Sequence, residues 1–221
     1  AITPLDVPTA KERRAARARL QLPMDGALIV YPGDLEFGHG ARTTIEAFAR
    51  LPDAHLVMAC RRKTPEARVK EDELRRLARR RAPGRVHWIG ETPHVHALLG
   101  AADVIALPTD TLFAKMDYPL VLLEAMSQER AVVVAEHTPA AELAVPAPED
   151  AGAEDGAHGQ EHAAAAVPPD VDALEATLRR LLENDDERAR IGAAGRRAVL
   201  QRFSPGPMAR AYEALYEELL T

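Results

Sequence analysis

The segment VIALPTDTLFAKMDYPLVLLEAMSQERAVVVA, residues 104–135, decides the fold class. It begins with a short apolar run at 104–107, continues through a longer segment of helical period at 120–128, and ends in a second apolar run at 132–135. Both apolar runs are too short for a helix and rich in β-branched residues, as expected of strands buried on both faces. This alternation is typical of a parallel α/β sheet.

The same alternation extends through the rest of the chain. The predicted strands are Ala27–Tyr31, His55–Cys60, Val86–Ile89, Val104–Leu107, Val132–Ala135 and Ala163–Val167. The predicted helices between them are Ala41–Leu51, Pro65–Arg81, Pro93–Leu99 and Leu120–Gln128. Apolar stripes at helical spacing predict three more helices at the end of the chain. We therefore predict a Rossmann-like, doubly wound parallel sheet of about six strands with C-terminal helices.

Two segments differ in character from this pattern. Residues 1–23 combine a Pro-punctuated extended piece with an Arg-rich helix at Lys11–Leu20, which is typical of an interdomain linker. The stretch Pro146–Pro169 is acidic and rich in Ala, Gly and Pro, and it predicts a long surface loop interrupted by a short strand. We expect a linker at 1–23 and one domain at 24–221.

Composition restricts the class of protein. The 221 residues are 47% hydrophobic and 28% charged, and no apolar run approaches the roughly 20 residues of a membrane helix. The one cysteine, Cys60, excludes an internal disulfide framework, and with no signal segment in view the cytoplasm is the expected location. A net charge of −6 argues against a general nucleic-acid binder, although residues 61–85 are strongly basic.

In an open parallel sheet, ligands bind beyond the carboxyl ends of the strands, so the loops that follow the strands are the first candidates. Residues 32–40 contain three glycines and lead into a helix. Such a loop lets backbone N–H groups approach a phosphate, or it is a plain tight turn. Arg61, Arg62 and Lys63 follow the second strand. They form either a diphosphate clamp or the start of the solvated face of the next helix.

The segment 115–126 carries the other candidates. Asp117 followed by Pro119 indicates the start of a helix. Glu124 is then a carboxylate among apolar helix neighbours, and it needs a partner or a ligand hydroxyl. The alternative is an exposed position that pairs with Gln128 or Arg130. No carboxylate cluster accompanies the histidines, so we expect no metal site.

Six segments, taken in order and spacing, resemble the C-terminal domain of family 4 retaining glycosyltransferases, which have the GT-B fold. These segments are VYPGDL (30–35), TIEAF (44–48), VHWIG (86–90), ADVIALPT (102–109), LLEAM (122–126) and AVVV (131–134). The resemblance covers about residues 24–220. It implies that the chain is one half of a GT-B enzyme.

The resemblance also implies roles for individual residues. Glu124 would accept hydrogen bonds from the ribose hydroxyls of a nucleotide sugar, because a carboxylate suits a vicinal diol. Backbone N–H groups near the start of the same helix would approach the phosphates, and the WIGE segment at 88–91 would lie against the base. The implied substrate-binding residues are Gly33, Ile89, Gly90, Leu122, Leu123 and Glu124.

Two departures from the family pattern concern the phosphates. Asp34 and His39 stand where the family has an arginine and a lysine that neutralise the donor diphosphate. An acid about 5 Å from a diphosphate opposes binding by several kcal/mol before screening, even at an effective dielectric of about 20. Either Asp34 points away, or other cations compensate. The candidates are Arg61, Arg42 and Lys115, of which Arg61 is the first choice.

A third departure concerns the donor sugar. The first glutamate of the family's pair falls at Met116 in this chain. Asp117 serves in its place, or it is only the cap of the helix. We take Asp117 and Lys115 as the predicted catalytic residues.

The leading hypothesis is therefore the donor-binding domain of a retaining glycosyltransferase, which moves a sugar from a nucleotide sugar to an acceptor hydroxyl. No metal cofactor is expected, and the nucleotide sugar is a substrate. The expected partner is an N-terminal acceptor domain or a split partner chain, without which the domain is expected to be inactive. The alternative is a catalytically degenerate half that acts as a binding or scaffold partner, which the missing cations and the missing glutamate would explain.

Overall fold

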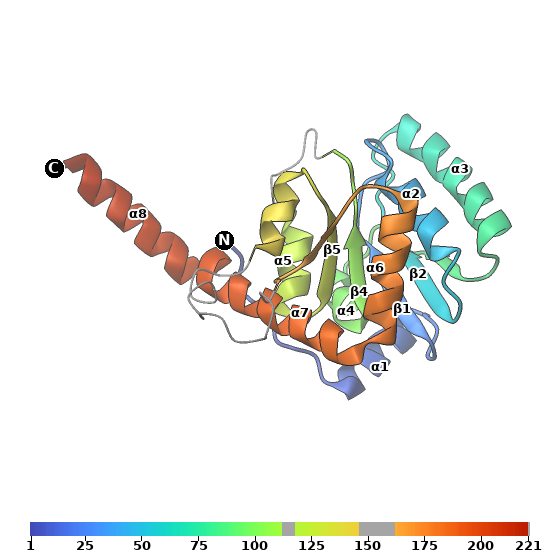
Figure 1. The fold of residues 1–221 in the computed structure, drawn as a ribbon, viewed down its shortest axis with the longest axis horizontal. Helices are drawn as coiled ribbons and strands as arrows, with labels where there is room; N and C mark the ends of the chain where they lie inside the picture. The colour runs from blue at the N-terminus through green and yellow to red at the C-terminus, as the bar shows by residue number, and fades with distance from the viewer. Residues whose placement is uncertain (112–117, 146–161, 221) are drawn as a thin grey trace.

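The computed structural model describes residues 1–111, 118–145 and 162–220. Within these residues, six strands form one sheet in the order β3-β2-β1-β4-β5-β6, and every neighbouring pair is parallel (Figure 1). The strands are β1 (Ala27–Tyr31), β2 (Ala54–Met58), β3 (Val86–Trp88), β4 (Val104–Leu107), β5 (Ala131–Ala135) and β6 (Ala165–Val167). The strand order reverses between β1 and β4, which makes this the switch point of the sheet.

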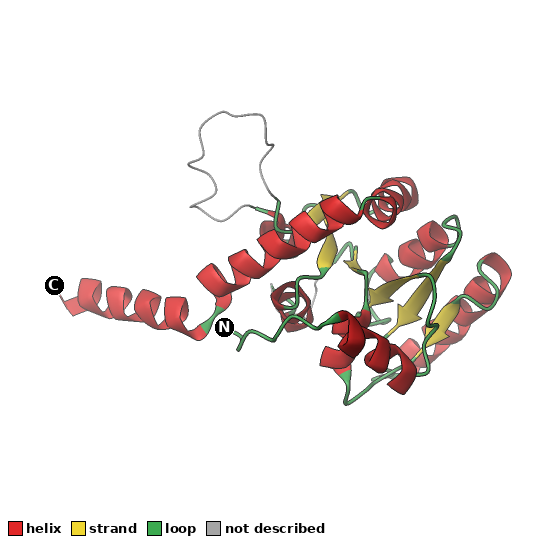
Figure 2. Ribbon diagram, turned by 90° about the horizontal axis from the view of Figure 1, so that it is seen from below, coloured by secondary structure: helices red, strands yellow, loops and turns green. Residues whose placement is uncertain are grey.

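Helices cover both faces of the sheet. Their bounds are α1 (Ala10–Arg19), α2 (Gly40–Phe48), α3 (Pro65–Arg81), α4 (Val95–Ala101), α5 (Leu120–Ser127), the 3₁₀ helix η1 (Pro139–Ala144), α6 (Val171–Glu183), α7 (Asp185–Ala198), the π-helical turn η3 (Val199–Phe203) and α8 (Pro205–Leu220). Contacts join α2 to α3 and α6, and another set joins α1, α4, α5 and α7. Helix α8 leads away from the sheet and buries no residue (Figure 2).

The strands were predicted correctly because the central ones are buried and therefore consist of apolar residues. Strands β1, β4 and β5 lie in the middle of the sheet, and nearly all their side chains are buried. The predicted parallel α/β sheet of six strands is confirmed, with strand ends that shift by one or two residues. The helix η1 and the turn η3 were not predicted. No helix in the described parts of the chain is long and apolar enough to cross a bilayer.

The N-terminal segment packs onto the domain. Helix α1 contacts α4, and Ile2 and Leu22 belong to the hydrophobic core. The backbone N–H of Ile2 donates to the carbonyl of Phe203 at 2.8 Å, which brings the start of the chain next to the base of α8. Residues 1–23 are thus fixed to this domain through buried side chains. Their role as a linker to another domain stays a prediction.

Two histidines, one on the edge strand β3 and one on its neighbour β2, make the stability of the domain depend on pH. His55 Nδ1 of β2 lies 3.1 Å from His87 Nε2 of β3, so at most one proton fits between them. Burial lowers the pKa of both side chains, with further lowering by Arg85 at His55 and by His55 at His87.

Because the folded state favours the neutral histidines, their contribution is complete above the unfolded pKa of about 6.5 and is lost as the pH falls toward the folded values. We therefore expect the thermal midpoint to drop by a few degrees between pH 7.5 and pH 5. The drop should be smaller in the His87→Asn variant. Circular dichroism melts of both proteins measure this, and an equal drop in both would contradict the assignment.

Candidate functional site

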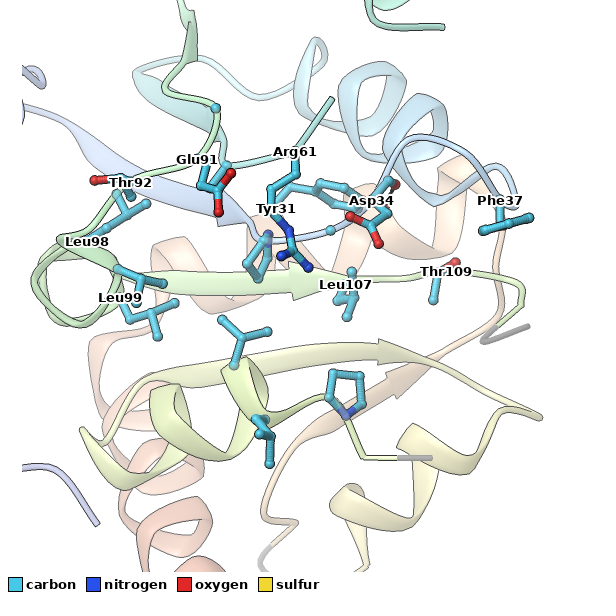
Figure 3. A pocket seen from close by; sticks show the side chains of 18 of the residues that line it. Tyr31, Asp34, Phe37, Arg61, Glu91, Thr92, Leu98, Leu99, Leu107 and Thr109 are labelled. Atoms are coloured by element: carbon cyan, nitrogen blue, oxygen red, sulfur yellow. Dashed lines mark hydrogen bonds between the residues drawn. The ribbon is translucent and has the colours of Figure 1, made fainter. Parts of the chain in front are cut away.

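A cavity of about 490 Å³ opens at the carboxyl ends of β1 and β4, beside the switch point of the sheet (Figure 3). Three of the predicted binding residues line it, namely Gly33, Arg61 and Gly90. Ile89, another predicted binding residue, directly follows β3 and is not part of the lining. Its N–H donates to the carbonyl of Met58 at 3.2 Å. Lys115 and Asp117, the predicted catalytic residues, lie outside the described residues.

The loop between β1 and α2 passes closely over Tyr31. A Cβ atom on Gly33 would lie 2.4 Å from the Tyr31 ring, so glycine is required there by the protein itself and not only by a ligand. Tyr31 is buried, which raises the pKa of its phenol far above the ordinary range. The ring therefore forms a neutral, fixed floor beneath the loop.

Asp34 lines the cavity beside Arg61 (Figure 3), so it does not point away from the site. Its carboxylate is 13% exposed and lies 3.4 Å from Nζ of Lys63. The first alternative raised by the sequence, that Asp34 points away, finds no support in this position. For the second, compensation by other cations, Lys63 is a further candidate.

The three cations that follow β2, residues 61–63, have different surroundings in the structure. Arg62 donates through Nε and one terminal nitrogen to Glu71 of α3 at 2.6 and 2.7 Å, and Arg75 donates to the same carboxylate. Burial alone would raise the pKa of Glu71, but these hydrogen bonds hold it below its ordinary value. Arg62 thus belongs to a structural ion cluster outside the cavity lining.

Arg61 is the cation that remains available to a ligand. It is exposed, lines the cavity, and has no carboxylate partner within residues 1–111, 118–145 and 162–220. Figure 3 shows its guanidinium pointing into the cavity. Arg42, another candidate from the sequence, pairs with Glu46 on its own helix at 3.1 Å and is not part of the lining. Arg61 is therefore placed to meet an anion.

Cys60 precedes this cation and is buried. Burial raises the pKa of its thiol to about 12, so the reactive thiolate is scarce at neutral pH. No three His, Cys, Asp or Glu side chains among the described residues come together to hold a metal ion.

Helix α5 presents its N-terminus to the cavity. Pro119 is the N-cap, and Pro119, Leu120 and Val121 line the cavity. The first N–H groups of a helix carry partial positive charge and lack helical partners, so they suit an anion. Leu122 and Leu123 lie further along the helix with buried side chains, and the N–H of Leu122 already donates to the Pro119 carbonyl at 2.9 Å.

Glu124 lies one turn beyond Val121 and is not part of the cavity lining. Its carboxylate is 25% exposed, and Oε1 is 3.3 Å from Nε2 of His96 on α4. Neither Gln128 nor Arg130, the partners considered from the sequence, forms this pair. The exposed His96 was missed because only the packing of α4 against α5 brings it to Glu124.

Much of the rest of the cavity is apolar, although Glu91 and three threonines also line it. Side chains of α4 and β4 form a continuous wall, which includes Leu98, Leu99 and Leu107. The cavity thus combines an apolar surface for a ring system with the guanidinium of Arg61 and a helix N-terminus for an anionic group. This combination suits a ligand that carries both, such as a nucleotide.

Comparisons with known proteins agree with this geometry. A profile of the family described as glycosyl transferases group 1 matches residues 12–198. No curated protein matches the chain.

Solved structures share the fold. Sucrose-phosphate synthase from Thermosynechococcus elongatus is 24% identical with a TM-score of 0.74, over 96% of this chain and 49% of that one. HepE from Anabaena, solved with UDP-glucose, is 18% identical with a TM-score of 0.76, over 96% and 56%. The C-terminal domain of LpcC, a glycosyl transferase group 1 family protein from Francisella tularensis, is 18% identical with a TM-score of 0.70, over 93% and 100%.

The chain spans about half the length of the first two of these proteins and the whole of the third. Its six-stranded parallel sheet with C-terminal helices is the C-terminal half of the GT-B fold, as the resemblance implied. The family profile covers most of the chain, from α1 to the end of α7. The chain therefore belongs to the glycosyl transferases group 1 family.

Proposed function

We propose that this domain binds the nucleotide-sugar donor of a retaining glycosyltransferase. The observation that carries the proposal is the cavity at the switch point, which is lined by Arg61, by the N-terminal residues of α5 and by an apolar wall of α4 and β4. HepE, which shares this fold, was solved in complex with UDP-glucose, and that complex supports a donor of this class.

In the proposed complex, the apolar wall of α4 and β4 packs against the nucleoside. The diphosphate lies between Arg61 and the first N–H groups of α5, at Leu120 and Val121. We place the ribose toward Glu124, one turn along the same helix from the lining residue Val121, so that its carboxylate accepts hydrogen bonds from the ribose hydroxyls. Its contact with His96 leaves the carboxylate partly exposed, so it can take up a diol.

The chemistry that follows is the departure of the diphosphate from the sugar. Negative charge develops on the leaving phosphate, and a fixed cation with an aligned helix dipole stabilises that charge more than the ground state. We assign this role to Arg61 and the N-terminus of α5. Lys115 and Asp117 remain proposed catalytic residues.

Transfer to an acceptor is proposed for the whole enzyme, because the chain spans about half of its full-length structural neighbours. An N-terminal domain or a partner chain would bring the acceptor hydroxyl to the sugar. The domain alone is then expected to bind the donor without transferring the sugar.

The second candidate is a degenerate half that serves as a scaffold. The position of Asp34 favours it, since this carboxylate lines the cavity close to the proposed diphosphate. The first measurement is therefore isothermal titration calorimetry with UDP, GDP and ADP. Saturable binding of one of them supports the proposal of a donor-binding domain. No binding up to millimolar nucleotide supports the alternative, a degenerate half that serves as a scaffold.

The Arg61→Ala variant tests which cation compensates for Asp34. We expect it to weaken diphosphate binding about tenfold, the effect of removing one charge-assisted hydrogen bond. The matched control is Arg76→Ala, an exposed arginine of α3 that is not part of the cavity lining. Equal affinity in Arg61→Ala and the control would show that Arg61 does not meet the diphosphate.

A further inference from the structure

The side chain of Asp110, which follows β4, holds the end of the loop between β1 and α2, residues 32–39. Asp110 accepts the backbone N–H of His39 at Oδ1, 2.7 Å away, and its Oδ2 lies 2.8 Å from Nδ1 of the His39 ring. His39 is also the N-cap residue of α2. One carboxylate therefore fixes both the end of the loop and the start of the helix.

The glycines of the loop show how close this contact is. Gly38 has a φ of +71°, and a Cβ atom there would lie 2.3 Å from Oδ1 of Asp110. A Cβ atom on Gly40 would lie 2.8 Å from Cα of Thr109. The backbone of the loop thus lies directly on residues 109 and 110, and no larger side chain fits between them.

The bonds to Asp110 are shorter than two other contacts of the loop. Asp34 meets Lys63 at 3.4 Å, and its carbonyl accepts from the Tyr31 hydroxyl at 3.5 Å. Burial alone would raise the pKa of Asp110, but the hydrogen bonds from His39 hold it below its ordinary value. Asp110 is therefore ionised at neutral pH, and both of its bonds are charge-assisted.

We propose that Asp110 is a positioning residue that holds the β1–α2 loop, and with it Gly33 and Asp34, at the diphosphate end of the cavity. Asp110 itself is not part of the cavity lining, so it acts through the loop. The proposal rests on the proposed function, because it assumes that this end of the cavity receives a diphosphate. Without Asp110 the loop is ordered only when the ligand binds, and the free-energy cost of this ordering weakens the binding of the ligand.

The test compares a nucleoside diphosphate with its nucleoside, which lacks the phosphates. The nucleotide that binds best among UDP, GDP and ADP is titrated by NMR against the wild type and four variants, and so is its nucleoside. We expect Asp110→Ala to reduce the preference for the diphosphate about tenfold, while Asp110→Asn, which keeps the oxygen acceptor for the His39 N–H, stays within about threefold of the wild type.

Two further variants complete the comparison. Gly38→Ala places a Cβ atom against Oδ1 of Asp110. It should reduce the preference for the diphosphate over the nucleoside as Asp110→Ala does. Asp72→Ala, which removes an exposed carboxylate of α3 outside the cavity, should leave it unchanged.

If Asp110→Ala and Gly38→Ala both kept the wild-type preference for the diphosphate over the nucleoside, the inference would be overturned. An equal loss of affinity for nucleoside and diphosphate would also overturn it, because that pattern marks a general structural role. If the wild type bound no nucleotide, the proposed function would fail and this inference with it. If Glu124→Ala weakened binding but Asp110→Ala did not, only the inference would fail.

Discussion

Replacement of Glu124 with alanine is expected to weaken the binding of nucleoside diphosphates about 100-fold. A carboxylate that accepts both hydroxyls of a ribose makes two charge-assisted hydrogen bonds. At the low end of their range, roughly 1.5 kcal/mol each, their loss totals about 3 kcal/mol, which corresponds to somewhat more than 100-fold. The fold should tolerate the change, because the carboxylate is partly exposed and its partner His96 is half exposed. Calorimetry with wild type and variant measures the loss directly.

The ligand supplies the control for this prediction. A 2′,3′-dideoxynucleoside diphosphate lacks the diol, so it should bind the wild type and Glu124→Ala with similar affinity. On the protein side, Glu66→Ala removes an exposed glutamate of α3 that is outside the cavity and should change neither affinity. A similar loss for ribose and dideoxyribose ligands would show that Glu124 acts on the fold of the helix and not on the sugar.

The fold was predictable because a parallel sheet buries both faces of its strands. Val104–Leu107 and Ala131–Ala135 are fully buried or nearly so, and each appears in the sequence as an uninterrupted apolar run. The helix Pro65–Arg81 was predicted with its observed bounds, since Thr64 caps its N-terminus and Pro65 occupies the first turn. The helix η1 was missed because six residues are too few to show a helical period.

The site was less predictable, because its contacts join distant parts of the chain. The sequence placed Arg61, Arg62 and Lys63 at one strand end, but only the orientation of α3 directs Arg62 to Glu71 and leaves Arg61 at the cavity. The Asp110 bond to His39 spans 71 residues, and no local pattern signals it. Residue types at strand ends therefore predicted where the site lies, but not which side chains are free.

At the amino ends of the strands, opposite the cavity, Asp103 joins several elements of the domain. Asp103 lies just before β4 and is 14% exposed. It pairs with Arg13 at 2.5 Å and Arg17 at 2.9 Å, both from α1, and accepts the backbone N–H of Leu28 at 2.7 Å. One carboxylate thus joins α1, β1 and β4.

We expect Asp103→Ala to destabilise the domain by about 3–5 kcal/mol, because it leaves the largely buried Arg17 and the N–H of Leu28 without this acceptor. Asp103→Asn keeps an oxygen for Leu28 and should lose less. The matched control, Asp172→Ala, removes an aspartate that is 84% exposed and pairs with Arg50, so it should change stability by less than about 1 kcal/mol. Urea unfolding followed by circular dichroism measures all three. Similar midpoints for Asp103→Ala and Asp172→Ala would mean that α1 is held by its apolar contacts alone.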